Sequence, residues 1–483
     1  VAANLANNPQ GAESVERRSG AKGNAEQPHM RRTQSRESMS QRLSRVREAA
    51  KQRKKERFTA LFHLLTAEAL ENAFLSLSRK AAAGVDGVRW KDYAENLKVN
   101  IADLHRRLHQ GSYRAQPGRR HYIPKADGKQ RPLGIASLED KIVQYALVKI
   151  LNAVYENDFM GFSYGFRPGR SQHNALDALA TGLVRTNVNW VLDADISQFF
   201  DKVSHEWLIR FIEHRIGDQR VIRLIRKWLT AGTSEEGEWR ASEEGTPQGA
   251  VISPLLANIY LHYVFDLWAH QWRRRHATGN VVMVRYADDI VIGFDKRIDA
   301  QCFRIAMQRR LKEFGLTVHP KKTRLTEFGR FAAENRASRG KGKPETFNFL
   351  GFTHISGKDR SGRFMLIRKT RRGRMTATLK AIKDGLRKRW HYSIPEQGKW
   401  LRRVVQGYLN YHSVPGNYPM MRKFRIYVTD LWRRALRRRS QQDDTTWTKA
   451  NRLAAVWLPK VRVLHPWPVE RFTARHPRQE PGA

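Results

Sequence analysis

The stretch that decides the fold is residues 281–294, which read VVMVRYADDIVIGF. Two short apolar runs flank Asp288 and Asp289, and this pattern predicts a β-hairpin with two carboxylates at its turn. A core strand rarely keeps adjacent aspartates, because burying an unpaired charge costs several kcal/mol. We therefore expect this turn either to be solvated or to lie against a cation.

A second stretch, residues 188–201, reads VNWVLDADISQFFD and adds further carboxylates. In an extended strand Asp193 and Asp195 share one face with Val191, since side chains alternate between the two faces. Such a strand, paired with the hairpin, would gather hard oxygen ligands. Mg²⁺ suits them, because it binds one or two carboxylates and completes its octahedron with water and substrate phosphates. Two such ions can stabilise the attacking and leaving oxygens of a phosphoryl or nucleotidyl transfer.

The composition is strongly basic. Lys and Arg number 89 against 46 Asp and Glu, which gives a formal net charge of +43 and a pI near 10.9. An excess of this size destabilises a compact chain by self-repulsion unless a polyanion neutralises it. We therefore expect nucleic acid as the partner, with strongly salt-dependent binding. Charge alone leaves open a non-catalytic binding protein of the ribosomal type.

The chain of 483 residues is long enough for several domains with cores of their own. Cys302 is the only cysteine, which excludes a disulfide framework and the usual cysteine-rich zinc sites. No run reaches the roughly 20 apolar residues of a membrane span, so we expect no membrane partner. The N-terminus lacks the apolar core of a secretory signal, and the expected location is a reducing cytoplasm.

Residues upstream of the aspartates give weaker signals. Residues 1–57 are polar and basic, and we expect disorder there or a helix that forms on binding RNA. Residues 119–135 predict a hairpin that turns at Asp127-Gly128, with Lys125 and Arg131 beside the turn, where both could reach one anion. Residues 246–249, TPQG, predict a loop whose glycine allows close approach of another backbone.

Three amphipathic helices follow a shift in composition near Arg368, and they predict a small bundle. Their polar faces are rich in arginine, and we expect these faces to bind nucleic acid. The arginines are Arg371, Arg372, Arg374, Arg433, Arg434, Arg437, Arg438 and Arg439. From residue 441 onward the chain predicts a separate basic module rich in tryptophan.

Six motifs stand in a fixed order along the chain. They are RPLGI (131–135), YGFRPGRS (164–171), DISQFFD (195–201), GTPQGAVISPLLANIYL (245–261), YADD (286–289) and FNFLGF (347–352). Together they resemble the reverse transcriptases encoded by bacterial group II introns, also called maturases, over residues 58–472. The resemblance implies an α+β fold of the right-hand polymerase type, with a palm built on an antiparallel sheet. The implied parts are an N-terminal extension (1–57), fingers (58–185), palm (186–355), helical thumb or domain X (360–440) and a small basic DNA-binding region (441–483).

The resemblance also implies roles for individual residues. Asp195, Asp288 and Asp289 match the catalytic triad that binds two Mg²⁺ ions, for which Mn²⁺ can substitute, and the backbone carbonyl of Ile196 is a further metal ligand. Residues at positions that contact the incoming dNTP are Lys125, Arg131, Phe200, Gln248 and Lys322, with the ring of Phe200 excluding a ribose 2′-hydroxyl. The strand that holds the primer corresponds to Phe347, Phe349, Leu350 and Gly351. Asp193 matches no family ligand, and we expect it to be solvated or to lie behind the ligands.

By this resemblance the chain copies an RNA template from a DNA primer with dNTPs, through a two-metal mechanism. It also binds its intron RNA to promote splicing, and target DNA on the bacterial nucleoid during retrohoming. Ala250 replaces a second glycine of many relatives and is small enough to be tolerated. No cysteines of a His-Asn-His endonuclease follow, so we expect mobility to need a primer from elsewhere.

Two other readings of the resemblance stay open. One is a splicing-only maturase whose polymerase has decayed, although the intact aspartates argue against it. The other is a related enzyme recruited for host defence. The sequence leaves the oligomeric state open.

Overall fold

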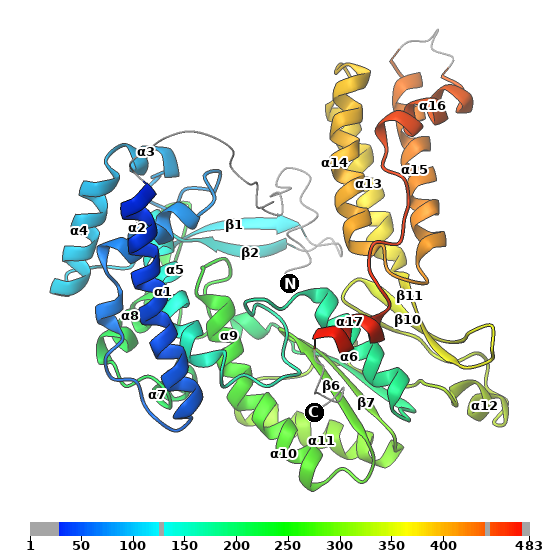
Figure 1. The fold of residues 1–483 in the computed structure, drawn as a ribbon, viewed down its shortest axis with the longest axis horizontal. Coiled ribbons are helices and arrows are strands. Elements are labelled where there is room, and N and C mark those ends of the chain that lie inside the picture. The colour runs from blue at the N-terminus through cyan, green and yellow to red at the C-terminus, as the bar shows by residue number, and fades with distance from the viewer. Residues whose placement is uncertain (1–28, 125–129, 440–444, 476–483) are drawn as a thin grey trace.

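The computed structural model describes residues 29–124, 130–439 and 445–475, with side chains from residue 39 onward. Figure 1 shows three parts: a helical lobe, a sheet at the lower centre and an upright helix bundle. This mixture of helices and antiparallel sheets confirms the α+β class and is consistent with a right-hand polymerase. The domain boundaries given above stay predictions.

The central sheet carries both aspartate stretches. Its strand order is β6-β7-β3-β8, and each neighbouring pair is antiparallel. Val191 packs into one core, whereas Leu192 and Ala194 pack into another, so the two faces of β3 are both covered. This alternation confirms the predicted shared face of Val191, Asp193 and Asp195. The strands are β3 (Trp190–Asp195), β6 (Val281–Tyr286), β7 (Asp289–Phe294) and β8 (Arg324–Glu327).

Helices cover both faces of this sheet. α6 (Gln172–Arg185) packs on β6, while α11 (Arg297–Glu313) packs on β3 and β7 from the other side. α9 (Ser253–Leu261) runs into α10 (Leu267–Arg275) through η4 (His262–Asp266), a stretch of π-helix. Such π-helical segments occur often at functional sites. Here the segment presents a buried acid to the central sheet, as described below.

The N-terminal lobe is helical. Its first helix packs on the last helix before the FSYGF loop, with Ala50 fully buried. Disorder predicted for residues 1–57 is therefore wrong over this helix, because Leu43, Val46 and Ala50 form an apolar stripe that the polar composition concealed. Residues 1–28 lie outside the described part. The elements are α1 (His29–Gln52), η2 (Phe62–Leu64), α2 (Ala67–Ser76), α3 (Trp90–Glu95), α4 (Leu97–Gln110), α5 (Leu138–Tyr155), α7 (His205–Glu213) and α8 (Gln219–Thr230).

The predicted hairpin of residues 119–135 is present. β1 (Gly118–Pro124) and β2 (Gln130–Ile135) pair antiparallel, with Ile123 opposite Arg131. The predicted turn and Lys125 lie outside the described residues. β4 (Thr233–Glu235) and β5 (Glu238–Arg240) extend the sheet in the order β2-β1-β4-β5. The sequence did not predict them, because strands of three mostly polar residues show no alternation.

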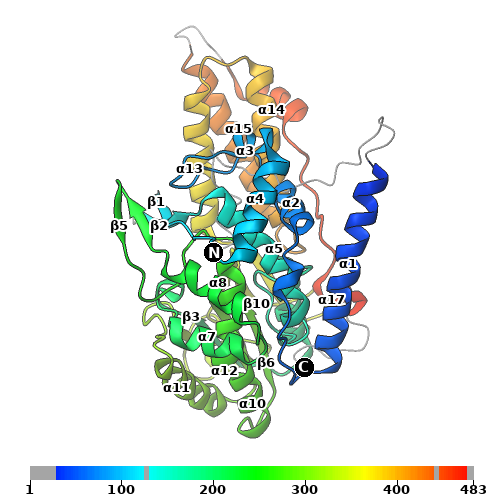
Figure 2. The ribbon, with the colours of Figure 1, turned by 90° about the vertical axis from the view of Figure 1, so that its left-hand side faces the viewer.

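A second hairpin leads into the upright bundle. β9 (Phe347–Phe349), β10 (Phe352–Lys358) and β11 (Phe364–Thr370) form one sheet, preceded by the short α12 (Ala332–Ala337). α13 (Arg372–Lys388), α14 (Ile394–His412) and α15 (Tyr418–Arg437) confirm the predicted three-helix bundle, which Figure 2 shows standing above the central sheet. Their apolar sides form a separate core around Met375, Leu401 and Trp432.

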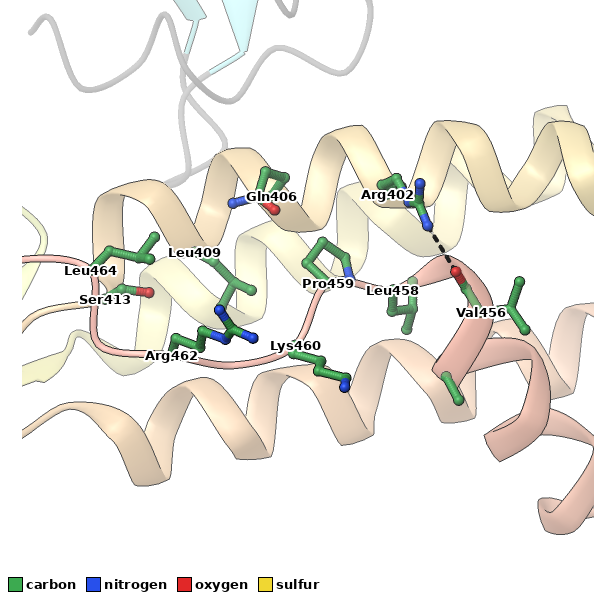
Figure 3. A pocket seen from close by; sticks show the side chains of 11 residues that line it. Arg402, Gln406, Leu409, Ser413, Val456, Leu458, Pro459, Lys460, Arg462 and Leu464 are labelled. Atoms are coloured by element: carbon green, nitrogen blue, oxygen red, sulfur yellow. Dashed lines mark hydrogen bonds between the residues drawn. The ribbon is translucent and has the colours of Figure 1, made fainter.

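The C-terminal residues return along the bundle to the central sheet. α16 (Trp447–Trp457) packs on α14 and α15, and the chain then descends beside α14 (Figure 3) to α17 (Pro468–Arg475), which packs on α6. We call residues 458–475 the C-terminal strap. Phe472 is buried in the core that contains Val191, and Arg471 pairs with Asp177 of α6. The prediction of a separate C-terminal module is therefore wrong for the described residues, because they bury their apolar sides against the bundle and the palm.

Two exclusions made from the sequence concern membranes and cysteine chemistry. Within the three described ranges, no helix combines the length and the apolar character that crossing a bilayer requires. Cys302 lies exposed on α11 as a free thiol.

Candidate active site

Asp195 and Asp289 lie directly opposite each other in the central sheet. They are paired residues of the antiparallel strands β3 and β7, so their side chains project from one face with Cβ atoms about 5 Å apart. Asp193, two residues before Asp195, shares this face and lies opposite Val291. The two stretches singled out in the sequence thus meet at one point of the fold.

Asp288 sits in the turn between β6 and β7. Tyr286 pairs with Asp289, which leaves Ala287 and Asp288 as a two-residue loop. Ala287 has a φ of 55°, a left-handed conformation that such hairpin turns need and that few residues other than glycine adopt. The predicted hairpin with two carboxylates at its turn is therefore present, and its turn is held in a conformation that its neighbours must support.

The carboxylates of this cluster disfavour one another's ionised form. Burial, with the nearby charges of Asp289 and Asp195, raises the pKa of Asp193 to about 7. Burial likewise raises the pKa of Asp289, to which Asp288 and Asp195 add. Burial also raises the pKa of Asp288, and Asp195 adds to this rise. Because opposite charge favours ionised carboxylates, a cation would stabilise the cluster.

Two basic side chains reach the cluster from different elements. Lys322 donates from Nζ to a carboxylate oxygen of Asp195, although most of its own side chain is exposed. The charge of Arg131 of β2 offsets part of the rise in the pKa of Asp288. The structure therefore brings two of the predicted dNTP-binding residues to the aspartates. Lys125, the third basic residue of that set, lies outside the described residues.

Gln248 and Phe200 are connected through η3 (Phe199–Asp201), the turn that follows β3. Gln248 donates from Nε2 to Asp201 Oδ1 at 2.7 Å, and its backbone carbonyl accepts from the backbone N–H of Gly134 at 2.6 Å. The backbone N–H of Thr246 donates to the carbonyl of Phe200 at 2.7 Å. These bonds join the loop that carries Gln248 to β2 on one side and to the aspartate strand on the other.

Gly249 explains why this loop can come so close. Its φ is 107°, and a Cβ at this position would lie 2.9 Å from the carbonyl oxygen of Gly134. Both facts require glycine, as predicted from the TPQG motif.

The Phe200 ring is nearly buried, with its edge toward Phe166 at a centroid distance of 6.3 Å.

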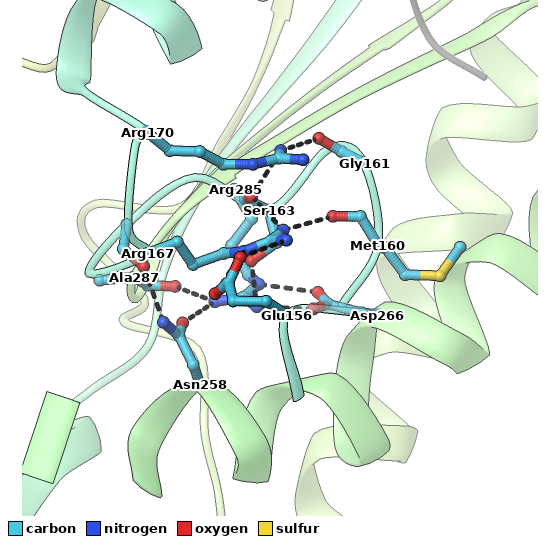
Figure 4. Close-up of polar contacts among 11 residues, drawn as sticks. Glu156, Met160, Gly161, Ser163, Arg167, Arg170, Asn258, Asp266, Arg285 and Ala287 are labelled. Carbon is cyan, nitrogen blue, oxygen red and sulfur yellow. Dashed lines mark hydrogen bonds and ion pairs between the residues drawn. The ribbon is translucent and has the colours of Figure 1, made fainter. Parts of the chain in front are cut away.

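Arg285 supports the hairpin turn through a group of buried polar contacts (Figure 4). Its guanidinium is fully buried and donates to both carboxylate oxygens of Asp266, at 2.7 and 2.6 Å. The same group donates to the carbonyl oxygen of Ala287 at 3.0 Å, to Asn258 Oδ1 at 3.1 Å and to Ser163 Oγ at 2.7 Å. One charged side chain thereby fixes the backbone next to Asp288 to the continuous α9–η4 helix and to the loop that contains Ser163. Sequence reasoning missed this residue, although an arginine inside the apolar run VVMVRY was a visible signal.

The YGFRPGRS loop packs against the same turn. A Cβ on Gly165 would lie 2.3 Å from the backbone nitrogen of Ala287. Asn258 donates from Nδ2 to the carbonyl of Gly165 at 2.7 Å, and the backbone N–H of Tyr164 donates to the carbonyl of Arg285 at 2.8 Å. The backbone of this loop is therefore hydrogen-bonded along β6, as a neighbouring strand would be. The sequence did not reveal this role.

The predicted primer-holding strand lies beside this turn. Phe347 and Phe349 are buried in the core that also contains Tyr286 and Ala287, so their rings pack inside the protein. Leu350 has a φ of 45°, and its carbonyl accepts from the hydroxyl of Tyr411 at 2.7 Å. Leu350 is buried in the same core, so the contact of these residues with a primer stays a prediction.

The predicted nucleic-acid arginines fall into two groups. Arg371, Arg372 and Arg374 lie where α13 begins, and the charge of Arg371 offsets a small part of the rise in the pKa of Asp193. The others lie at the far end of α15, about 30 Å along a helix of this length. There Arg433 and Arg434 pair with Asp430, Arg439 donates to the carbonyl of Tyr392, and Arg437 and Arg438 are exposed.

The donor set suits Mg²⁺ better than a metal that needs a complete protein cage. Among the described residues, no three carboxylate, imidazole or thiol side chains converge into one ligand group. Asp195 and Asp289 still offer paired oxygens on one face, with Asp288 in the adjoining turn. Mg²⁺ commonly takes one or two carboxylates together with water and substrate phosphates. The residues present therefore fit this ion.

Residues 123–354 match the family model described as reverse transcriptase (RNA-dependent DNA polymerase). This span contains the central sheet, the YADD turn and the four clustered aspartates Asp193, Asp195, Asp288 and Asp289. The chain contains a reverse transcriptase domain. The match begins in β1 and ends in β10, so it includes the β1–β2 hairpin as well as the central sheet.

Curated relatives of the chain include intron-encoded proteins. Protein YkfC of Escherichia coli is 43% identical over 206 residues, covering 42% of this chain and 54% of that protein. The group II intron-encoded protein LtrA of Lactococcus lactis is 37% identical over 223 residues, which is 46% of this chain and 37% of LtrA. The putative COX1/OXI3 intron 1 protein of Saccharomyces cerevisiae is 26% identical over 393 residues, or 67% of this chain and 46% of that protein. The chain thus spans about half or less of the length of these relatives.

Proposed function

We propose that the chain is an RNA-directed DNA polymerase of a group II intron that also binds its intron RNA to promote splicing and supports retrohoming. The observation that carries this proposal is the placement of Asp195 opposite Asp289, with Asp288 in the adjoining turn. Reverse transcriptase similarity over residues 123–354 supports the same activity. Its setting would be the bacterial cytoplasm, with RNA template, DNA primer, dNTPs and target DNA as partners.

The proposed chemistry is a two-metal nucleotidyl transfer. Asp195, Asp288, Asp289 and the carbonyl of Ile196 would hold Mg²⁺, or Mn²⁺ in its place, and the bound ions would lower the pKa of the primer 3′-hydroxyl and offset charge on the transferred phosphate. Ile196 follows directly after β3, which supports its assignment.

The chain's own residues bind and orient the substrates. Arg131 and Lys322 stand beside the aspartates and supply positive charge for the triphosphate, as charge-assisted contacts require. Lys125 is assigned to the same task from its motif. Phe200 excludes the 2′-hydroxyl of a ribonucleotide, and Gln248, tied to Asp201 and Gly134, positions the nascent base pair.

Splicing assistance needs no catalytic residue. It needs a basic surface that binds and stabilises folded RNA, and the net charge of +43 supports such binding. The exposed arginines at the two ends of the bundle, around Arg371 and Arg437, are the proposed contacts. A splicing-only maturase is the second candidate, and a host-defence enzyme the third. The assembled aspartate cluster favours a working polymerase over the splicing-only reading.

The test is primer extension on an RNA template with dNTPs and Mg²⁺, comparing wild type with Asp288→Ala. Asp384→Ala serves as the matched control, because Asp384 is an exposed aspartate on α13 away from the site. We expect extension by wild type and the control but none by Asp288→Ala, with RNA affinity equal in all three. No extension by the wild type, together with tight salt-sensitive RNA binding, would establish the splicing-only function instead.

A further inference from the structure

A cavity of about 510 Å³ lies between α14, the end of α16 and the C-terminal strap (Figure 3). Its floor is apolar, since Leu409 and Leu458 are buried there. Its rim carries Arg402, Lys460 and Arg462, and none of the described residues that line it is acidic. The volume falls within the roughly 300–1,000 Å³ usual for sites that take small organic groups.

The frame of this cavity is fixed at both ends. Arg402 of α14 donates to the carbonyls of Val456 and Trp457, at 2.8 and 3.1 Å. At the other end the carbonyl of Ser413 accepts from the backbone N–H groups of Leu464 and His465, at 3.0 and 3.1 Å. These bonds fix the chain to α14 on either side of the cavity. The cavity is therefore present without a ligand.

A third anchor comes from the neighbouring helix. Arg425 of α15 donates to the carbonyls of Ala454 and Pro459, at 2.8 and 3.1 Å. A segment without regular structure is thereby held by two arginines and one serine carbonyl. A pre-formed site pays little ordering entropy when its ligand binds.

The charges of the rim specify the ligand's chemistry. No carboxylate of the described residues forms an ion pair with Arg402, Lys460 or Arg462, and the latter two are exposed. Beside these cations the mouth exposes apolar side chains, with Val456 61% and Leu464 50% exposed. A ligand that carries an anion next to a flat apolar ring satisfies both features, and a nucleotide is such a ligand.

We propose that this cavity binds one unpaired nucleotide of a nucleic-acid strand. The base lies on the floor formed by Leu409 and Leu458, and the phosphate lies at Arg402, Lys460 and Arg462. This inference rests on the proposed function for the presence of nucleic acid and adds a recognition site outside the polymerase centre. An unpaired nucleotide is favoured over a paired one, because removing a paired base from its stack costs a few kcal/mol.

The experiment measures binding of the full chain, without Mg²⁺, to a short single strand with one 2-aminopurine and to a blunt duplex of equal length. Both DNA and RNA versions are used, since either strand could supply the nucleotide. Gln406→Trp fills the cavity mouth from α14, and Arg462→Glu reverses one rim charge. Arg403→Glu is the matched control, because Arg403 neighbours Arg402 on α14 but does not line the cavity.

We expect Gln406→Trp to weaken single-strand binding by about fivefold or more, to remove the 2-aminopurine fluorescence change and to leave duplex binding unaltered. Arg462→Glu should weaken single-strand binding more than Arg403→Glu and reduce the salt slope by about one. The nucleic acid that shows the larger effect identifies the source of the nucleotide. Equal effects of the two charge reversals, or no effect of Gln406→Trp, would overturn the proposal.

Primer extension on a pre-annealed substrate separates this inference from the proposed function. If the wild type extends the primer but Gln406→Trp and Arg462→Glu bind the single strand no more weakly than the control, the cavity site alone is overturned. Failure of extension together with the expected binding losses overturns the polymerase alone.

Discussion

Arg285 and Asp266 form an ion pair from which solvent is fully excluded, with Arg285 Nη2 2.6 Å from Asp266 Oδ2. The acid comes from the π-helical turn between α9 and α10, and the base comes from β6, three residues before Asp288. Since Arg285 also holds the carbonyl of Ala287, the pair transmits the position of the helices to the catalytic turn.

Removing one partner of this pair should be costly. Asp266→Ala leaves a buried guanidinium without its counter-charge, and we expect a loss of about 3–5 kcal/mol in the free energy of unfolding. Urea denaturation measures this loss. Glu206→Ala removes an exposed partner of Arg210 and should cost at most about 1 kcal/mol. A similar, small loss in both variants would show that Arg285 is not braced by Asp266.

Phe200→Ala should relax sugar selection. If the ring blocks a 2′-hydroxyl, its removal should raise ribonucleotide incorporation about tenfold or more, equivalent to about 1.4 kcal/mol of discrimination. The measurement is the ratio of kcat/KM values for a dNTP and its ribonucleotide. Phe166→Ala is the control, because that ring packs at the edge of Phe200. Unchanged selectivity in Phe200→Ala would remove the assignment.

Gly249→Ala should damage the junction between the Gln248 loop and β2. Its φ of 107° and the 2.9 Å approach to the Gly134 carbonyl both oppose a Cβ, and strain of this kind costs about 1–3 kcal/mol. We expect a lower unfolding free energy and a raised KM for dNTPs. Gly407→Ala, within α14 and with open space around its Cβ position, should instead stabilise the chain by about 0.5–1 kcal/mol. Equal stability changes would contradict the argument.

Three buried histidines near the base of the bundle should make the free energy of unfolding decrease as the pH is lowered. Burial lowers the pKa of His173, His354 and His412 to about 3, whereas an unfolded histidine has a pKa of about 6.5. Between these values the unfolded chain binds more protons, so stability is lost as the pH falls below about 6.5. Each histidine should cost about 1.4 kcal/mol at pH 5.5, one unit below its unfolded pKa.

Urea denaturation at pH 7.5 and 5.5 measures this loss. His354→Phe, at a position that stacks on Phe347 at 4.7 Å, should reduce the pH dependence by one histidine's share. Replacing the exposed His121 by Phe is the control and should leave it unchanged. An unaltered pH dependence in His354→Phe would show that His354 does not contribute.

The sequence predicted the elements whose pattern is local. The hairpin at residues 281–294, the shared face of Asp193 and Asp195, the β1–β2 hairpin and the three bundle helices all rest on alternation or helical spacing within one segment. The family motifs then placed Asp195 with Asp288 and Asp289, and the pairing of β3 with β7 brings them together.

What the sequence missed depends on contacts between distant segments. Arg285 became informative only once Asp266, Asn258 and Ser163 surrounded it. The apolar stripe of α1 was hidden in a polar segment. The place of α17 depends on the contact of Arg471 with Asp177, which lies 294 residues earlier in the chain. The secondary-structure propensity of a segment carries no information about contacts with residues so far away in the chain.

The C-terminal strap changes how the bundle can move. The chain leaves β11 at Arg371, passes through three helices and is fastened again to α6 by Arg471 and Phe472. The bundle is therefore attached to the rest of the fold at both of its chain ends, and Tyr411 of α14 adds a further bond to Leu350. Any rotation of the bundle about Arg371 must stretch the strap or break the contacts between α17 and α6, so those contacts oppose such a motion.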